Sequence, residues 1–129
     1  HIKVPMFSVG TTRDHVAPWR SAYKIHELAE TDVTFLLTNG GHNAGIISAP
    51  GHPRRHYFMK TTPAGAPHED PDEWRSKATG QGGSWWPAWI SWIDERTSAM
   101  IAAPAAKWVA DDGDGGRMID APGGYVLMK

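Results

Sequence analysis

Two residues that could support acid–base catalysis, Asp14 and His42, each follow a run of strand-forming residues. A hydrolase with a Ser or Cys nucleophile needs a histidine as general base and a carboxylate that holds the imidazole in one tautomer. In α/β-hydrolases the chain order is nucleophile, acid and histidine, and here the acid precedes the histidine. Asp14 and His42 are therefore candidates for such a pair. The alternative is that they are ordinary residues of turns, where Asp is common.

The sequence contains no residue that completes a triad. It has no Cys, and no G-x-S-x-G motif occurs, because the nearest match, residues 82–86, ends in Trp. The absence of Cys also excludes disulfides, thiolate zinc sites and redox Cys pairs within these 129 residues. A complete catalytic triad cannot be assembled from this chain.

A second set of candidate residues lies in a turn-rich stretch: His52, His56, His68, Arg54, Arg55 and Lys60. His52 and His56 are four residues apart, as in zinc-binding helices, but Pro53 and the turn residues around it argue against a helix there. We therefore interpret this stretch as a basic surface loop, and we expect no metal site. The arginines and Lys60 could instead steer an anionic ligand such as a nucleotide phosphate.

The elements that must position Asp14 and His42 form a predicted β–α–β unit. It consists of a strand over residues 4–9, a helix that starts at Pro18 and continues until Thr31 breaks its pattern, and a strand over residues 33–38. Apolar side chains at helical spacing, from Trp19 to His26, give the helix one buried face. Two strands that flank one helix pair in parallel with a right-handed crossover. Both candidates then follow the carboxyl ends of neighbouring strands, at the edge where α/β sheets bind ligands.

The rest of the chain predicts loops and two further helices. Residues 48–70 are predicted to form a long turn-rich segment. A short helix is predicted to begin at Asp70–Arg75 and to end at residues 80–83, and a second helix, capped by Ser84, is predicted over residues 85–97. Residues 100–116 are predicted to be irregular, and residues 123–128 to form a short terminal strand. Four of the seven Trp residues fall in residues 85–92. We interpret this cluster as packing in preference to a ligand or lipid platform.

Composition excludes two broad classes. Thirteen basic and 14 acidic side chains give a net charge of −1, which disfavours a nucleic-acid binder that depends on counterion release. No apolar run approaches the roughly 20 residues needed to span a bilayer. The chain opens His1-Ile2-Lys3 without Met, and we expect a fragment or a processed chain.

Four segments together resemble polyhydroxyalkanoate synthases. Residues 10–19 (GTTRDHVAPW) are similar to the acid-bearing segment of that family, residues 38–47 (TNGGHNAGII) to its histidine-bearing segment, and residues 83–89 (GSWWPAW) and 121–127 (APGGYVL) to its C-terminal signatures. The combination of these motifs and their spacing covers nearly the whole chain. The resemblance implies that residues 1–129 are the C-terminal portion of an α/β-hydrolase-like catalytic domain.

The resemblance also implies a function. Enzymes of this family polymerise (R)-3-hydroxyacyl-CoA into polyester and release CoA, using a Cys–Asp–His triad and no cofactor. Motif matching makes Asp14 the triad acid, which orients the imidazole, and His42 the base, which activates the thiol. His15 neighbours the acid and is expected to line the substrate site. The family further implies a cytoplasmic homodimer that works on the growing polyester at a granule surface.

The chain departs from the family pattern because it lacks the Cys elbow. We therefore expect these 129 residues alone to be inactive, and to self-associate through a bare strand edge. Two alternatives stay open. One is the C-terminal part of another α/β-hydrolase, such as a thioesterase or a polyester depolymerase, which a Ser in place of Cys at the upstream elbow would indicate. The other is a non-catalytic, Trp-rich module that binds granules or another protein.

Overall fold

The structure is a computed structural model that describes residues 2–102, 126 and 128. The chain divides into two units, residues 1–97 and 98–129. The α-helices and β-strands of the described part all lie in the first unit. The expected irregular segment over residues 100–116 and the expected terminal strand over residues 123–128 fall almost entirely outside the described residues.

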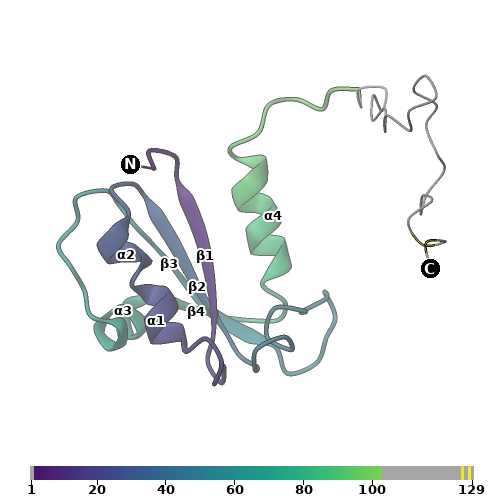
Figure 1. Ribbon diagram of the computed structural model, residues 1–129, viewed down its shortest axis with the longest axis horizontal. Helices are drawn as coiled ribbons and strands as arrows, with labels where there is room; N and C mark the ends of the chain where they lie inside the picture. Colours follow the sequence, from purple (N-terminus) through teal and green to yellow (C-terminus); the bar gives the residue numbers. More distant parts are fainter. Residues whose placement is uncertain (1, 103–125, 127, 129) are drawn as a thin grey trace. The chain divides into compact units, whose positions relative to one another are not determined.

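A four-stranded mixed sheet forms the centre of the first unit, in the order β1-β2-β3-β4 (Figure 1). The strands are β1 (Met6–Thr11), β2 (Val33–Thr38), β3 (His56–Thr62) and β4 (Thr79–Gly82). β1 and β2 run parallel, with Met6 opposite Val33 and Thr11 opposite Thr38, whereas β2–β3 and β3–β4 are antiparallel. The predicted parallel pair is therefore confirmed, and the bounds predicted for β2 match those observed.

The expectation of a loop over residues 48–70 and of a helix terminator at residues 80–83 was wrong, because β3 and β4 fall there. Turn-forming residues flank β3 on both sides, and its sequence does not alternate between polar and apolar residues. β4 reads Thr-Gly-Gln-Gly and is fully exposed, so its own sequence disfavours a strand. Pairing with the edge of β3 gives β4 its extended conformation.

The predicted helix after Pro18 consists of two short helices, α1 (Trp19–Tyr23) and α2 (Ile25–Leu28). Pro18 is the residue before the helix and not part of its first turn. The carbonyl oxygen of Tyr23 accepts from His26 Nδ1 at 2.9 Å, while the backbone N–H of Glu27 bonds instead to Lys24 O. A side chain thus takes the acceptor that a continuous helix would use, and the helix tightens and divides at this point.

The two later helices are α3 (Pro71–Lys77) and α4 (Trp86–Asp94). α3 is confirmed: the Asp70 side chain accepts from two backbone N–H groups of its first turn, and Pro71 occupies a position where no N–H is needed. α4 is shorter than predicted, and Trp85 is its N-cap residue. Ser84 Oγ still accepts from Trp86 N at 3.1 Å, so it supplies a capping bond from one position earlier.

Aromatic side chains cover both faces of the sheet. Helices α1, α2 and α3 lie on one side and α4 lies on the other (Figure 1). The buried residues are Trp19, Tyr23, Phe35, Leu37 and Trp74 on the first side, and Leu36, Tyr57 and Trp85 on the second. Most of the described Trp side chains are therefore packed, whereas Trp89 is 41% exposed. No helix in the described part of the chain is long and apolar enough to cross a bilayer.

Candidate functional site

Asp14 and His42 meet at the carboxyl edge of the parallel strands, as their positions after β1 and β2 predict. The loops after the two strands continue the strand pairing, since Thr12 N donates to Thr38 O and Arg13 N to Gly40 O, each at 2.9 Å. This pairing brings His42 Nδ1 to 2.8 Å from Asp14 Oδ2.

Each carboxylate oxygen of Asp14 has its own donors. Oδ1 accepts from the backbone N–H groups of Val16, at 2.9 Å, and Ala17, at 2.8 Å, while Oδ2 faces the imidazole of His42. The Ala17 N–H, and after it the hydrogen bond from His42, lower the pKa of Asp14 below its ordinary value of 3.8. The carboxylate is therefore ionised at neutral pH, and it is held in one orientation.

An ionised carboxylate only accepts hydrogen bonds, so the proton of the short contact belongs to His42 Nδ1. The neutral imidazole then carries its lone pair on Nε2. Asp14 is nearly covered, with 8% of its side chain exposed, whereas 48% of the His42 side chain is exposed. The exposed Nε2 atom of His42 can therefore accept a proton, while the hydrogen bond between Nδ1 and Asp14 Oδ2 keeps the imidazole in one tautomer. A general base requires both features.

Glycines allow the His42 loop to lie directly on β1. Gly40 has a φ of +121°, and a Cβ there would lie 2.7 Å from Gly45 Cα. A Cβ at Gly45 would lie 2.5 Å from the Thr11 Cγ2 atom of β1. Larger residues at these two positions would push the loop away from the strand and move His42 relative to Asp14.

Sequence reasoning missed the residues that hold the far side of this loop. The side chains of Ser84, Trp85 and Trp86 donate hydrogen bonds to backbone carbonyls of residues 45–48. The sequence indicates this segment by its density of Trp, interpreted as packing, by Ser84 as a helix cap, and by the similarity of residues 83–89 to a family signature, but none of these predicts a contact with the loop after His42. Nothing in the spacing of residues about 40 positions apart identifies such a contact.

The other predicted candidates do not join the pair. His15 is exposed on the loop beside Asp14, and no hydrogen bond from its side chain is seen within residues 2–102. His52 lies in the turn-rich segment before β3, as the loop interpretation predicted, whereas His56 is the first residue of β3, which that interpretation did not predict. No three His, Asp or Glu side chains of the described residues form a group that could hold a metal ion.

The basic residues considered for an anionic ligand are divided between two places. Arg54 and Arg55 directly precede β3, at the same sheet edge as His42, and the Arg55 guanidinium is 3.5 Å from Ile47 O. Lys60 instead forms an ion pair with Glu69. Hydrogen bonds from Lys60 and Lys77 lower the pKa of Glu69.

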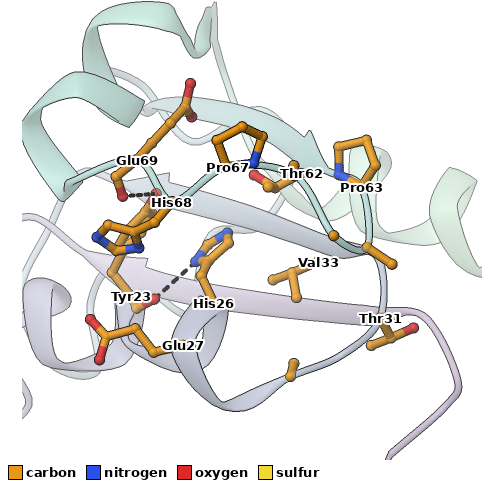
Figure 2. A pocket seen from close by; sticks show the side chains of 14 residues that line it. Tyr23, His26, Glu27, Thr31, Val33, Thr62, Pro63, Pro67, His68 and Glu69 are labelled. Atoms are coloured by element: carbon orange, nitrogen blue, oxygen red, sulfur yellow. Dashed lines mark hydrogen bonds between the residues drawn. The ribbon is translucent and has the colours of Figure 1, made fainter.

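A pocket of about 330 Å³ lies at the opposite edge of the sheet from Asp14 and His42. Figure 2 shows the side chains of His26, Val33, Thr62 and His68 around it. Val33 begins β2 and pairs with Thr62 at the end of β3, which places the pocket at the far ends of these strands. Burial lowers the pKa of His26, so its imidazole stays neutral there. The pocket does not contribute to the Asp14–His42 site.

The described unit is thus a mixed sheet with helices on both faces and a hydrogen-bonded Asp–His pair at its carboxyl edge. No family model matches the chain. It is 31% identical over 128 residues to a poly(3-hydroxyalkanoate) polymerase subunit of Rhizobium meliloti, 34% over 128 residues to a poly(3-hydroxyalkanoate) polymerase of Methylorubrum extorquens, and 34% over 132 residues to a polymerase subunit of Cupriavidus necator. Each match covers 99% of this chain and 20% of the relative.

The resemblance to polyhydroxyalkanoate synthases is therefore confirmed: the chain is homologous to one section of these polymerases. It spans about a fifth of the length of the curated relatives it matches.

Proposed function

We propose that this chain is the part of a polyhydroxyalkanoate synthase that carries the catalytic acid and base, within the C-terminal portion of an α/β-hydrolase-type domain. The observation that supports this most is the 2.8 Å contact between His42 Nδ1 and Asp14 Oδ2, at the carboxyl edge of the sheet, in a chain homologous to polymerases. The complete enzyme would polymerise (R)-3-hydroxyacyl-CoA and release CoA.

In the proposed mechanism, His42 Nε2 accepts the proton of a Cys thiol, which lies outside these 129 residues since they contain no Cys. The thiolate attacks the thioester carbonyl of the acyl-CoA, and the bond to the CoA sulfur breaks. CoA leaves as a thiol with the proton from His42, and the acyl group stays on the Cys. Asp14 keeps the imidazole in the Nδ1–H tautomer, stabilises the imidazolium and aids activation of the incoming hydroxyl. His15 lines the substrate site.

The remaining parts of the proposal concern the setting of the enzyme. The polymerase would act in the cytoplasm at the surface of polyester granules, as a homodimer and without a cofactor. The 129 residues alone would have no synthase activity, because the nucleophile is absent from them. Turnover of an acyl-CoA by this chain alone, lost on His42→Ala substitution, would contradict the proposal.

The direct test uses a polypeptide that contains both this chain and the Cys nucleophile. We expect His42→Ala to abolish acylation of the Cys by a 3-hydroxyacyl-CoA, measured by mass spectrometry of the intact protein. His52→Ala is the matched control, because His52 is another exposed loop histidine, and its Nδ1 lies 2.8 Å from the carbonyl oxygen of Pro53 and not beside a carboxylate. Acylation at the normal rate in the His42 variant would refute the assigned role.

A further inference from the structure

Three consecutive side chains donate hydrogen bonds to the loop that follows His42. Trp85 Nε1 donates to Gly45 O at 3.1 Å, Trp86 Nε1 donates to Ile46 O at 3.0 Å, and Ser84 Oγ donates to Ser48 O. We call residues 84–86 the clamp. The clamp therefore binds the backbone of the loop and not its side chains.

The clamp is itself held firmly. Gly83, which precedes it, has a φ of +98° and donates its N–H to Arg55 O at 2.7 Å, which ties the segment to the start of β3. Trp85 is buried against Leu36 and Tyr57 on the α4 side of the sheet. The indole donors are thus fixed to the same sheet that positions Asp14.

The clamped residues are linked to His42 through one turn. Gly45 N donates to Gly41 O at 2.9 Å, which closes the turn that contains His42. Asp14 is oriented independently, by the N–H groups of Val16 and Ala17. The distance between Asp14 and His42 therefore depends on where the loop lies, and the clamp fixes one side of that loop.

We propose that Ser84, Trp85 and Trp86 are positioning residues that keep His42 Nδ1 within hydrogen-bond distance of Asp14. The importance of this clamp for catalysis rests on the function proposed above, whereas its effect on the imidazole does not. A role in packing alone would predict that replacing an indole by a phenyl ring loosens the fold without changing the state of His42.

The test measures which ring nitrogen of His42 carries the proton, by long-range ¹H–¹⁵N NMR of the ¹⁵N-histidine-labelled chain near pH 8. His42→Ala assigns the signal. Trp86→Phe and Ser84→Ala each remove one clamp donor and keep most of the side chain, and Ser84→Ala also removes the acceptor of the Trp86 N–H at the start of α4. We expect each to lower the ratio of the Nδ1–H to the Nε2–H tautomer about three- to tenfold, the range for one lost hydrogen bond, and the double variant to lower it further.

Trp92→Phe is the matched control. Trp92 lies on the same helix, and its Nε1 donates to Thr34 Oγ1 of β2 at 3.1 Å, so the change removes one equivalent hydrogen bond that is not made to the loop. We expect the His42 ratio in this variant to equal that of the parent chain. Circular dichroism and thermal unfolding verify that each variant is folded. If Trp85→Phe does not fold, the other two clamp variants decide.

Two results would overturn the clamp: an unchanged ratio in the folded Ser84→Ala/Trp86→Phe double variant, or an equal loss in Trp92→Phe. A ratio that falls only in the clamp variants supports it. If the ratio falls but acylation in the nucleophile-containing polypeptide is unaffected, the clamp still positions His42 but its importance for catalysis is contradicted; the role of His42 as base is tested separately by His42→Ala.

Discussion

Replacement of Asp14 by Asn is a sharp test of how the Asp–His pair works. The Oδ1 atom of Asp14 accepts two backbone N–H bonds, from Val16 and Ala17. The amide oxygen of Asn must take this position, because the NH₂ group cannot accept. The NH₂ group then occupies the place of Oδ2, 2.8 Å from His42 Nδ1. Two donors would face each other unless His42 moves its proton to Nε2.

The magnitude follows from the hydrogen bonds that fix the amide. Turning it over would lose both backbone bonds, at about 1 kcal/mol each, so the orientation with oxygen toward the backbone is favoured roughly 30-fold. His42 would therefore adopt the Nε2–H tautomer, in which the nitrogen that must accept the thiol proton is already protonated. In a Ser–His–Asp triad the corresponding change lowers turnover on the order of 10⁴-fold. We expect a loss of similar size in Cys acylation.

Two assays follow this change. Long-range ¹H–¹⁵N NMR on the chain reports the tautomer, and the acylation rate is measured in a polypeptide that contains the nucleophile. Asp32→Asn is the control, because Asp32 is an exposed acid whose Oδ1 also accepts a backbone N–H, from Ala64 at 2.9 Å. If His42 keeps its proton on Nδ1 in Asp14→Asn, the carboxylate of Asp14 does not set the tautomer and the reasoning is refuted.

The same substitution has a signature in acid. Because the pKa of Asp14 is lowered in the folded state, its contribution to stability is present above pH 3.8 and is lost as the pH falls through the lowered value. The Asn variant lacks this titration. The free energies of unfolding of the parent chain and of Asp14→Asn, measured in urea, should therefore differ at neutral pH and converge in strong acid. A difference that stays constant with pH would contradict the lowered pKa of Asp14.

Three further predictions concern stability. Trp74 is 0% exposed in the aromatic core, so Trp74→Ala should lower the free energy of unfolding by about 3–5 kcal/mol in urea titrations. Trp89 is 41% exposed, and Trp89→Ala should lower it by about 1 kcal/mol or less. Equal losses in the two variants would contradict the central place of Trp74 in the core. Asp70→Ala removes the acceptor for two N–H groups at the start of α3, and thermal unfolding should show a loss of about 1 kcal/mol that Asp70→Asn largely restores. Burial raises the pKa of Tyr23 from 10.0 to about 12, so the parent chain should lose roughly 2–3 kcal/mol of stability as the pH rises over that range. Tyr23→Phe should not lose stability over this pH range. An equal fall in the free energy of unfolding of both proteins between pH 10 and 12 would contradict the raised pKa of Tyr23.

The sequence predicted the parts of the site that depend on local pattern. A run of apolar and β-branched residues is buried on both faces in β2, so its strand signal is strong and its bounds could be predicted. Parallel pairing with β1 followed from the intervening helix. These two facts place Asp14 and His42 at one edge. The capping of α3 by Asp70 is equally local, and it was equally predictable.

Other features depend on partners that lie far away along the chain. β4 has no strand propensity of its own, and it exists because β3 offers an unpaired edge. The helix after Pro18 divides because the His26 side chain donates to the carbonyl oxygen of Tyr23. The helical spacing of apolar residues does not predict this hydrogen bond.

The sequence by itself determined that an acid and a histidine follow neighbouring parallel strands, and that the chain contains no nucleophilic thiol. Only the tertiary structure decided that Asp14 Oδ2 meets Nδ1 of His42, and that residues 84–86 hold the loop that follows His42. The physical reason is the separation along the sequence between the residues that interact. Strand and cap signals are carried by residues within a few positions of one another. A 2.8 Å contact between two loops requires the whole sheet to fix both ends.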